Sequence, residues 1–551
     1  MVPLAAFGLP IAVALPLALA DALQPSAWDA LAADPRVPGA LLLSLRSAVV
    51  ATALSLGLTL WLTTRLHGSR AWPGVARALA PLLAVPHAAF AIGLAWLVAP
   101  AGALARELAP LAGWTDPPDW GTVHDAGAWG LTAVLVFKEL PFLLWQAVAL
   151  LARPEVDADL RRQQALARSF GLAPSAWWWQ LGWPQWLPRL AWPLLAVAAY
   201  ALTVVDLALI VGPTAPPPLA VLAYADLIDA DRAHNARGAA AALTLALVLA
   251  AGVALVGFAA PVCGRLWRRV ATAGWRPAPA GPSPRRIAVA TSGGVALIYA
   301  LVIATLVLLS IAGVWTFPDA LPQRWTMAAW ATVAASAGTL GFTVALAAGA
   351  SLLALALTVG WLEATPAAWD RWALPAVLAP LVVPSLLLMS GLYAAALALA
   401  IDGTRTGVLW AHVLVVLPYT MLTLRPAWRG FDPRFAQTAL TLGRGRIVFW
   451  CRVKAPLLAA PLAAAAAVGF AVSVAQFLAT QFLGTGRHPT LTTEAVTLAS
   501  GGQRSLAAAF ALLQALLPMA AFALAATVAR RRGAAPVAPA SAIAPVGVVW
   551  R

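Results

Sequence analysis

Lysine is almost missing from this sequence. Among 551 residues only Lys138 and Lys454 are lysines, and neither follows a glycine. A phosphate-binding loop of the form G-x4-G-K-[S/T] therefore cannot be written anywhere in the chain, which excludes an ATP-hydrolysing motor of that kind. The hydrolase motifs G-x-S-x-G and H-E-x-x-H are also missing, so we expect no catalytic residue and no cofactor bound by this chain.

Charged residues and cysteines are scarce too. Only 10% of the residues are charged while 62% are hydrophobic, whereas soluble domains contain about 25% charged residues. This composition excludes an ordinary soluble protein and indicates a membrane protein. Cys263 and Cys451 are the only cysteines, too few for a disulfide framework or a metal site. Asp116, Asp119, His124 and Asp125 share a loop but match no usual ligand spacing, so we expect no metal.

Long apolar segments are what the sequence has in abundance. A membrane-spanning helix needs roughly 20 mostly apolar residues, and about twelve segments of that kind can be marked. They lie near residues 3–20, 40–63, 79–99, 129–151, 190–212, 238–262, 287–315, 330–360, 374–399, 407–426, 457–483 and 505–529. We expect an all-α polytopic membrane protein of six plus six spans. The first segment lacks the basic residues that open a signal peptide, so we expect a retained span.

The net charge of +15 comes from arginines that gather on alternate loops. The basic loops hold Arg65, Arg70 and Arg77; Arg153, Arg161, Arg162, Arg168 and Arg189; Arg265, Arg268, Arg269, Arg276, Arg285 and Arg286; and Arg530 to Arg532. The loops between them are acidic or mixed. Because cytoplasmic loops carry the excess of arginine, both termini and the loops at 153–189 and 428–456 are predicted to be cytoplasmic. Topology thus explains the charge without a nucleic-acid partner.

Those two cytoplasmic loops repeat each other at a constant offset of 272 in the numbering. The first reads QQALARSFGLAPSAWWWQLGWP and the second AQTALTLGRGRIVFWCRVKAP. Each contains a glycine and a proline at the same G-x12-P spacing, Gly171 with Pro184 and Gly443 with Pro456. A helix stop needs a residue that can adopt positive φ, which suits the glycine. A proline suits the start of the next helix.

The repeat continues along both halves of the chain. Further pairs at the offset of 272 are Gly212 with Gly484, Pro217 with Pro489, Leu219 with Leu491, and Arg232 with Arg504. Upstream, Pro141 pairs with Pro418, and Pro86-x6-Gly93 pairs with Pro384-x6-Gly391. An ordered series of this kind indicates a duplication. Duplicated halves in a transporter usually surround a shared path near the bilayer midplane.

The two loops resemble the EAA motif of ABC importer permeases, E-A-A-x3-G-x9-I-x-L-P. The matching residues are Ala165, Leu166, Ala167, Gly171, Leu181, Trp183 and Pro184 in the first loop, and Gln437, Thr438, Ala439, Gly443, Val453, Ala455 and Pro456 in the second. Neither loop keeps the glutamate of the motif, because Ala165 and Gln437 stand in its place. We therefore expect docking by shape and apolar contact.

Nearly the whole chain is similar to the fused, two-domain permeases of the ferric iron and thiamine importer class. The stretch 486–505 is most similar to a YnjC-type branch of that class. The resemblance implies a first permease domain at 1–263, a cytoplasmic Pro/Arg-rich linker at 264–286, a second permease domain at 287–532 and a tail at 533–551. It implies a bacterial inner-membrane location, two copies of a cytoplasmic ATPase that holds ATP and Mg²⁺, and a periplasmic solute-binding protein. It does not identify the solute.

Three charged residues lie inside predicted spans: Lys138 and Glu139 in the fourth and Asp206 in the fifth. Ionisable groups in a membrane are costly and usually functional. They line the path in one interpretation and form a structural pair in the other, with Asp206 as the expected partner of Lys138. Tryptophans at 177–179, 183, 186 and 192 are expected to form a belt at the membrane interface.

Two other functions are compatible with parts of this pattern. A twelve-span secondary transporter driven by an ion gradient would use Lys138, Glu139 and Asp206 as a proton relay, but it leaves the duplicated loop unexplained. A membrane-embedded glycosyl- or lipid-transferase would need acidic catalytic residues at an interface, and Asp116 and Asp119 belong to no recognisable motif. An ABC importer permease accounts for the most features.

Overall fold

The computed structural model describes residues 2–273 and 282–531. Within these ranges all regular elements are helical, and the single isolated β-bridge joins Ala312 to Trp325. The fold is therefore the all-α fold expected from the sequence. Part of the predicted linker (274–281) and the predicted tail (533–551) lie outside the described residues.

The first half of the chain forms fourteen α-helices and two short irregular helical turns. They are α1 (Val2–Ala22), α2 (Pro25–Ala33), α3 (Val37–Leu66), α4 (Trp72–Ala84), α5 (His87–Val98), α6 (Ala103–Ala112), α7 (Trp129–Leu151), α8 (Pro154–Ser169), α9 (Pro174–Trp177), η1 (Trp178–Gly182), α10 (Trp183–Trp186), η2 (Leu187–Leu190), α11 (Ala191–Thr203), α12 (Asp206–Val211), α13 (Leu219–Leu227) and α14 (Arg232–Thr272).

The second half follows the same order. Its elements are α15 (Pro282–Ser310), α16 (Ala328–Ala335), α17 (Ala337–Ala364), η3 (Ala367–Trp369), α18 (Asp370–Leu378), η4 (Ala379–Leu381), α19 (Ser385–Ala398), α20 (Arg405–Arg429), α21 (Arg434–Thr441), α22 (Arg446–Phe449), η5 (Trp450–Lys454), α23 (Ala455–Leu457), α24 (Ala459–Val474), α25 (Leu478–Gly484), α26 (Leu491–Ser500) and α27 (Arg504–Arg531).

The number of long apolar helices is smaller than the twelve spans predicted. In the described residues eight helices are long and apolar enough to cross a membrane, and two bent helix pairs bring the number to ten. One pair, Ala367–Leu381 with Ser385–Ala398, bends by 100°, and the other, Arg446–Leu457 with Ala459–Val474, bends by 72°. The two remaining predicted spans, 3–20 and 190–212, correspond to α1, which has 21 residues, and to α11 and α12, which are separated by a break after Thr203.

The duplication is visible in the elements themselves. Leu219 and Leu491 begin α13 and α26, and both are fully buried. The backbone N–H of Leu219 donates to Oγ of Ser44 (2.9 Å), and that of Leu491 donates to Oγ1 of Thr343 (3.0 Å). Arg232 and Arg504 are likewise the first residues of α14 and α27. Sequence pairs at the offset of 272 thus occupy equivalent places in the fold.

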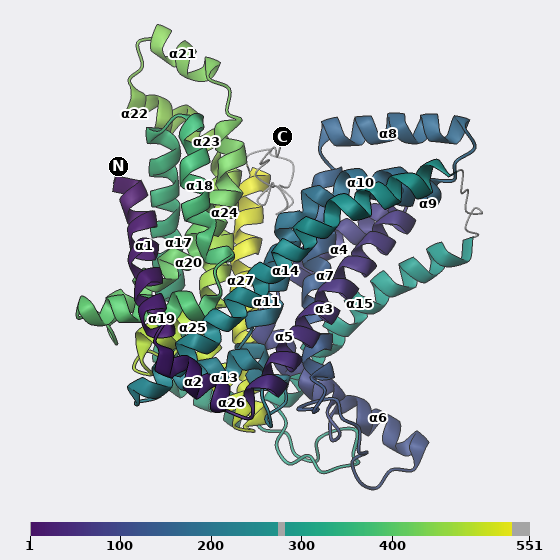
Figure 1. Cartoon of the computed structure of the whole chain (residues 1–551), viewed down its shortest axis with the longest axis vertical. Coiled ribbons are helices and arrows are strands. Elements are labelled where there is room, and N and C mark those ends of the chain that lie inside the picture. The colour runs from purple at the N-terminus through teal and green to yellow at the C-terminus, as the bar shows by residue number, and fades with distance from the viewer. Residues whose placement is uncertain (1, 274–281, 532–551) are drawn as a thin grey trace.

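The two halves exchange their first helices. Helix α1 packs against α17, α18 and α19 of the second half, and α15 packs against α3, α4 and α5 of the first. Each first helix also packs against the last long helix of its own half, α1 on α14 and α15 on α27. In Figure 1 the purple α1 lies among the green helices on the left, while the teal α15 lies on the right beside α3. The halves are therefore interlocked.

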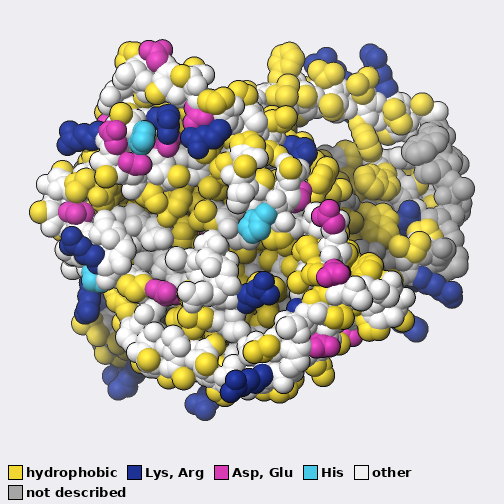
Figure 2. Space-filling model, turned by 90° about the horizontal axis from the view of Figure 1, so that it is seen from below, with side chains coloured by type: hydrophobic (Ala, Val, Ile, Leu, Met, Phe, Trp, Pro, Cys, Tyr) yellow, Lys and Arg dark blue, Asp and Glu magenta, His cyan; other side chains and the backbone are white. Residues whose placement is uncertain are grey.

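The halves diverge at one end of the molecule and converge at the other (Figure 1). Helices α8 and α21 project from the diverging end, one on each half. Helices α13, α26 and α6 lie at the converging end. Seen from that converging end, acidic and basic side chains are scattered over the surface among apolar ones (Figure 2). One large cluster of buried apolar side chains spans both halves and forms the main core.

Candidate functional site: the paired loops and the central cluster

The first repeated loop contains a helix and a tight turn. Helix α8 ends at Ser169, and Gly171 follows with φ +75°. The N–H of Gly171 donates to the carbonyl of Arg168 (2.9 Å), and the N–H of Leu172 donates to the carbonyl of Ala167 (2.9 Å). This pair of bonds is the Schellman motif, which satisfies the last carbonyls of a helix and requires a residue at positive φ.

The second repeated loop contains the same turn. Gly443 follows α21 with φ +66°. Its N–H donates to the carbonyl of Leu440 (3.0 Å), and the N–H of Arg444 donates to the carbonyl of Ala439 (2.9 Å). Every donor and acceptor matches its equivalent in the first loop at the same offset of 272. The prediction that both glycines end a helix at positive φ is confirmed.

The motif residues before each glycine face the same way in both loops. In the first loop Ala165 and Leu166 are exposed while Ala167 is buried. In the second loop Gln437 and Thr438 are exposed while Ala439 is buried. The buried alanine lets each helix lie close to the body of the protein. The first two positions remain accessible to a partner.

A π-helical turn follows each Schellman turn. In η1 the N–H of Trp183 donates to the carbonyl of Trp178, and in η5 the N–H of Ala455 donates to the carbonyl of Trp450. Pro184 and Pro456 then stand in the first turns of α10 and α23. Proline has no N–H to continue the ordinary bonding pattern, which accounts for a local widening of the helix at this point. Both prolines begin the next helix, as predicted.

The bases of the two loops differ in chemistry. Trp177, Trp178, Trp183 and Trp186 are each at most 3% exposed and pack together with Leu160 under the first loop. The Trp183 indole N–H donates to Oγ1 of Thr64 (2.9 Å). The expectation of a tryptophan belt at the membrane interface is therefore wrong for these four. They sit in a core because the loop folds back over them.

The histidine at the end of α3 joins this aromatic base. His67 lies edge-on to the rings of Trp72 and Trp178, at centroid distances of 5.4 and 5.5 Å. Burial among these rings lowers the pKa of His67, because the charged form loses water. The neutral imidazole is thus favoured where α3, α4 and the first loop meet.

Ion pairs take the place of tryptophans under the second loop. Asp370 is buried and accepts from Arg425 (2.8 Å) and Arg429 (2.8 Å). Arg429 also donates to the carbonyls of Leu362 and Thr365. Lys454 pairs with the carboxylate of Glu363. The second loop is held by charge and the first by aromatic packing.

Lys138 does not bind Asp206 as the sequence suggested. Lys138 is buried, and its Nζ donates to the carbonyl of Val85 (2.7 Å). That carbonyl is free because α4 ends at Ala84 and Pro86 caps α5. Among the described residues no ion pair joins Lys138 to Asp206. The break between α4 and α5 gives the lysine a backbone partner that sequence alone did not reveal.

Glu139 and Asp206 both lie near a histidine that sequence reasoning left unassigned. Oε1 of Glu139 lies 3.5 Å from Nε2 of His87. The His87 ring meets the ring of Tyr200 edge-on (5.0 Å), and Asp206 is close enough to both residues for Coulomb interaction. The His87 side chain is 40% exposed, whereas that of Glu139 is 6% exposed. These groups form a central cluster of which one member reaches solvent.

The charged members of the central cluster come from the first half, while Tyr299 and Tyr419 of the second half lie close enough to Glu139 for Coulomb interaction. At the repeat offsets, Glu139 corresponds to Val416, Asp206 to Leu478 and His87 to Ser385. The one signal for His87 in the sequence is its position directly after Pro86, at a predicted helix break. Among the described residues no group of three or more His, Cys, Asp or Glu side chains is arranged to hold a metal.

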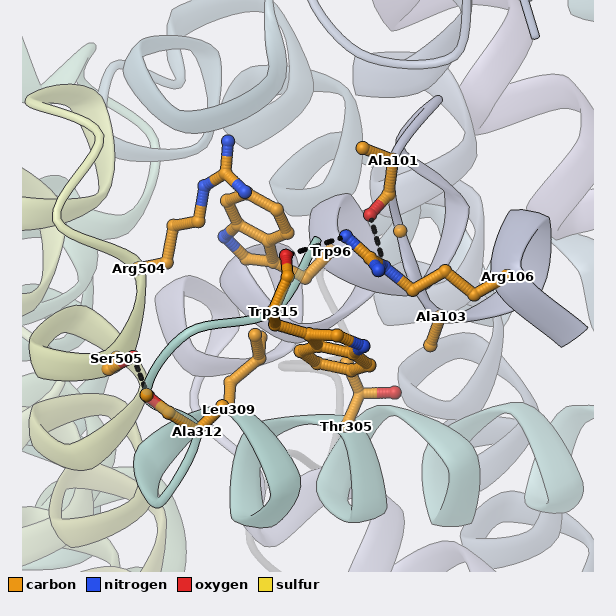
Figure 3. Close-up of a pocket in the computed structure, with 12 residues that line it drawn as sticks. Trp96, Ala101, Ala103, Arg106, Thr305, Leu309, Ala312, Trp315, Arg504 and Ser505 are labelled. Carbon is orange, nitrogen blue, oxygen red and sulfur yellow. Dashed lines mark hydrogen bonds between the residues drawn. The ribbon is translucent and has the colours of Figure 1, made fainter. Parts of the chain in front are cut away.

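Contacts between the halves close the converging end. The Arg504 guanidinium of α27 lies 4.2 Å from the ring centre of Trp96 in α5, and Oγ of Ser505 donates to the carbonyl of Ala312. Arg106 of α6 donates to the carbonyls of Ala101 and Trp315. Figure 3 shows these side chains around a cavity of about 80 Å³. Arg504 thus links α27 to α5, and Arg106 links α6 to the loop after α15, so each arginine connects one half to the other.

Comparison with known proteins gives two relatives, and no protein-family model matches the chain. The chain is 36% identical over 515 residues to the Inner membrane ABC transporter permease protein YnjC of Escherichia coli (strain K12), a match covering 93% of this chain and 92% of that protein. It is 30% identical over 115 residues to the Sulfate transport system permease protein CysT of the same organism, covering 20% of this chain and 42% of that protein.

Proposed function

Since this chain belongs to the family of ABC transporter permeases, we propose that α8 and α21 are the elements that couple it to ATP hydrolysis in partner subunits. The chain is the multi-pass, membrane-spanning subunit of such a transporter in the inner membrane. It contains no G-K-[S/T] sequence, so ATP and Mg²⁺ belong to a separate cytoplasmic ATPase. The proposal is that each of the two loops receives one copy of that ATPase.

The observation that carries this proposal is the pair of matched turns. Two projecting helices at equivalent places in the repeat end in identical Schellman motifs at Gly171 and Gly443 and lead into identical π-helical turns. Both helices project from the same end of the molecule (Figure 1). A turn fixed by backbone bonds transmits a push on the helix to the following span. The arginines around both loops support a cytoplasmic position.

The transport cycle follows from the arrangement of the halves. A solute-binding protein delivers solute at the converging end, and ATP draws the two ATPases together under α8 and α21. The interlocked halves then rock against each other around the central cluster. ATP drives this change only if it binds one arrangement more tightly than the other.

The test exchanges the turn glycines for valine. Gly443→Val places a β-branched side chain at positive φ, which costs about 1–2 kcal/mol or more because Cβ crowds the backbone carbonyl. A Cβ at Gly443 meets no atom within 4 Å, so the backbone alone is strained. We expect Gly171→Val and Gly443→Val to insert normally but to lose ATPase co-purification or solute-stimulated ATP hydrolysis.

Two glycines serve as matched controls. Gly445 lies two positions beyond Gly443 with φ −67°, so Gly445→Val adds the same side chain without the strain. Gly113, after α6 at the converging end, has φ +70° and an open surrounding, so Gly113→Val adds the strain far from both loops. Both controls should keep coupling. Full transport with both loop glycines replaced would refute the proposal. Uptake without any ATPase would favour the ion-gradient transporter.

A further inference from the structure

The cavity at the converging end is lined by two arginines from opposite halves of the chain. Arg106 belongs to α6 of the first half and Arg504 to α27 of the second, and both line the space of about 80 Å³. In Figure 3 their side chains approach the cavity from different sides, with Trp96 between them in this view. The two guanidinium groups are close enough for Coulomb repulsion. The cavity thus concentrates positive charge at a contact between the halves.

No carboxylate balances this charge directly. In the described part of the chain neither Arg106 nor Arg504 forms an ion pair with Asp or Glu. Asp319 is near enough to Arg106 for Coulomb attraction, but the atom that Arg106 binds is its backbone carbonyl oxygen, and the Asp319 carboxylate accepts from Gln323. A charge removed from water is costly unless it is paired, so the two arginines favour an anion beside them.

Arg106 forms a fixed wall of the cavity, because it is only 3% exposed and its side chain is held by backbone carbonyls. Its Nε, Nη1 and Nη2 atoms donate to the carbonyl oxygens of Ala101 (2.9 Å), Thr316 (2.6 Å), Asp319 (3.1 Å) and Trp315 (3.2 Å). A guanidinium has five N–H groups, so these four bonds leave one donor. Neutral carbonyls satisfy the hydrogen bonds of Arg106 but leave its positive charge in place.

Other hydrogen-bond donors around the cavity have no partner within the described residues. Thr305 of α15 lines the cavity and is 5% exposed, and no described residue hydrogen-bonds its hydroxyl. A buried polar group without a partner is rare and costly. The Arg504 guanidinium lies over the ring of Trp96 at 4.2 Å, and none of its N–H groups donates to a described residue. Stacking on a ring leaves the N–H groups of a guanidinium free to bind an anion.

We propose that this cavity binds one small inorganic anion, held by Arg504, Arg106 and the hydroxyl of Thr305. The space of about 80 Å³ has room for a few water molecules and therefore suits an anion of a few atoms. Arg504 and Thr305 belong to the second half and Arg106 to the first, so the anion connects the halves and offsets the repulsion between the two arginines. The inference does not depend on the proposed function, since the cavity lies at the end opposite α8 and α21 (Figure 1).

The experiment measures binding of radiolabelled inorganic phosphate to the full chain in detergent by equilibrium dialysis, in a buffer without chloride. We expect saturable binding at one site per chain. Arg504→Gln should lower the affinity by about tenfold or more, because charge-assisted hydrogen bonds are lost. Thr305→Val keeps the branched shape of the side chain and removes one neutral hydrogen bond, so it should lower the affinity by about two- to tenfold.

Arg232→Gln is the matched control. Arg232 is equivalent to Arg504 at the offset of 272, is exposed and begins α14 as Arg504 begins α27, but it does not line this cavity. Its replacement should leave phosphate binding unchanged. An equal loss in Arg232→Gln and Arg504→Gln would show diffuse electrostatic attraction and overturn the proposal, as would wild-type protein without saturable binding.

Thermal unfolding of the same proteins shows whether each variant is folded and gives a second measurement. A ligand that binds only the folded state raises the unfolding midpoint. Phosphate should raise the midpoint of wild type and Arg232→Gln equally and that of Arg504→Gln by less. Comparison of the two variants removes the general stabilising effect of phosphate salts. Equal shifts in all three proteins would contradict binding at this cavity. Neither assay contains an ATPase, so both outcomes are independent of the coupling test.

Discussion

The carbonyl oxygen of Ala14 lies so close to Gly391 that a Cβ on Gly391 would stand 1.9 Å from it. The equivalent glycine, Gly93, has the same relationship with α15: its Cβ would stand 2.6 Å from Cγ1 and 2.9 Å from the carbonyl oxygen of Val302. Each glycine thus lets the first helix of one half cross the other half at backbone contact. The repeated Pro-x6-Gly spacing marks the points at which the halves interlock.

Alanine at these two positions should destabilise the protein. Gly391→Ala forces α1 outward, and overpacking of this kind typically costs about 1–3 kcal/mol. We expect a lower midpoint of thermal unfolding in detergent for Gly391→Ala and for Gly93→Ala. Gly360 in α17, where a Cβ would meet nothing within 4 Å, is the control. Gly360→Ala should unfold at the same temperature as wild type or higher. An equal fall of the unfolding midpoint in all three variants would show that the loss does not come from the helix crossings.

The stability lost on removal of the Lys138 charge should not be restored by a second substitution at Asp206. Lys138→Met leaves the Val85 carbonyl without its donor, and a buried unpaired polar group costs about 1–3 kcal/mol. Because Nζ binds Val85 and not Asp206, Lys138→Met with Asp206→Leu should show additive losses of stability. His87→Phe with Glu139→Gln should instead show coupling, since groups in contact typically interact by about 0.5–3 kcal/mol. Thermal unfolding of the six variants measures both cycles.

The repeat could be predicted from sequence because it depends on local backbone chemistry. A glycine at a helix end, the proline that completes the G-x12-P spacing and an alanine before the turn each act on the backbone close to themselves. The positive φ of Gly171 and Gly443 could therefore be predicted from the sequence. The permease family and the similarity to YnjC could also be recognised from sequence, since the match to the permease YnjC extends over 93% of the chain.

The partners of the charges could not be predicted, because they depend on how distant segments pack. Lys138 is 53 residues from Val85 in sequence, and only the break between α4 and α5 exposes that carbonyl. The tryptophans of the first loop read as interfacial because their spacing does not reveal that η1 folds over Leu160. The repeated glycines Gly93 and Gly391 are the sequence signal of the exchange of α1 and α15. Two glycines alone do not identify the helix that crosses them.

Low pH should destabilise the folded protein through His67, which packs against the tryptophans under the first loop. Burial lowers the pKa of His67 in the folded protein, so the unfolded chain, with a pKa of about 6.5, binds the proton first. Stability is thus unaffected above about pH 7 and is lost as the pH falls through about 6.5. His67→Phe removes the titration and keeps a ring between Trp72 and Trp178. Between about pH 7.5 and about pH 5 we expect the unfolding temperature of wild type to fall by more than that of His67→Phe; parallel curves would contradict this.

One copy of this chain should assemble with two ATPases. One polypeptide supplies both halves of the permease and both loop turns, so the transporter does not need a second copy of this chain. Native mass spectrometry of the purified transporter should give one permease and two ATPase subunits. The second loop is held partly by the half-exposed Lys454–Glu363 ion pair and the first by aromatic packing. High salt should therefore release the ATPase at the second loop first, because salt screens exposed ion pairs. Two permeases in one complex would exclude this arrangement.

Phe170 and Leu442 should bind the ATPase without contributing to the fold. They occupy the equivalent position immediately before each turn glycine and are 68% and 70% exposed. Since neither loop has the glutamate of the motif, apolar contact at these positions is the expected source of affinity, and burying one such side chain contributes about 1.5–3 kcal/mol. Phe170→Ser and Leu442→Ser should therefore leave thermal unfolding of the isolated permease unchanged while weakening ATPase binding by about tenfold or more.

Leu111 in α6 is 86% exposed at the converging end, so Leu111→Ser should alter neither quantity. Unchanged ATPase affinity in Phe170→Ser with Leu442→Ser would show that other surfaces of the loops carry the docking.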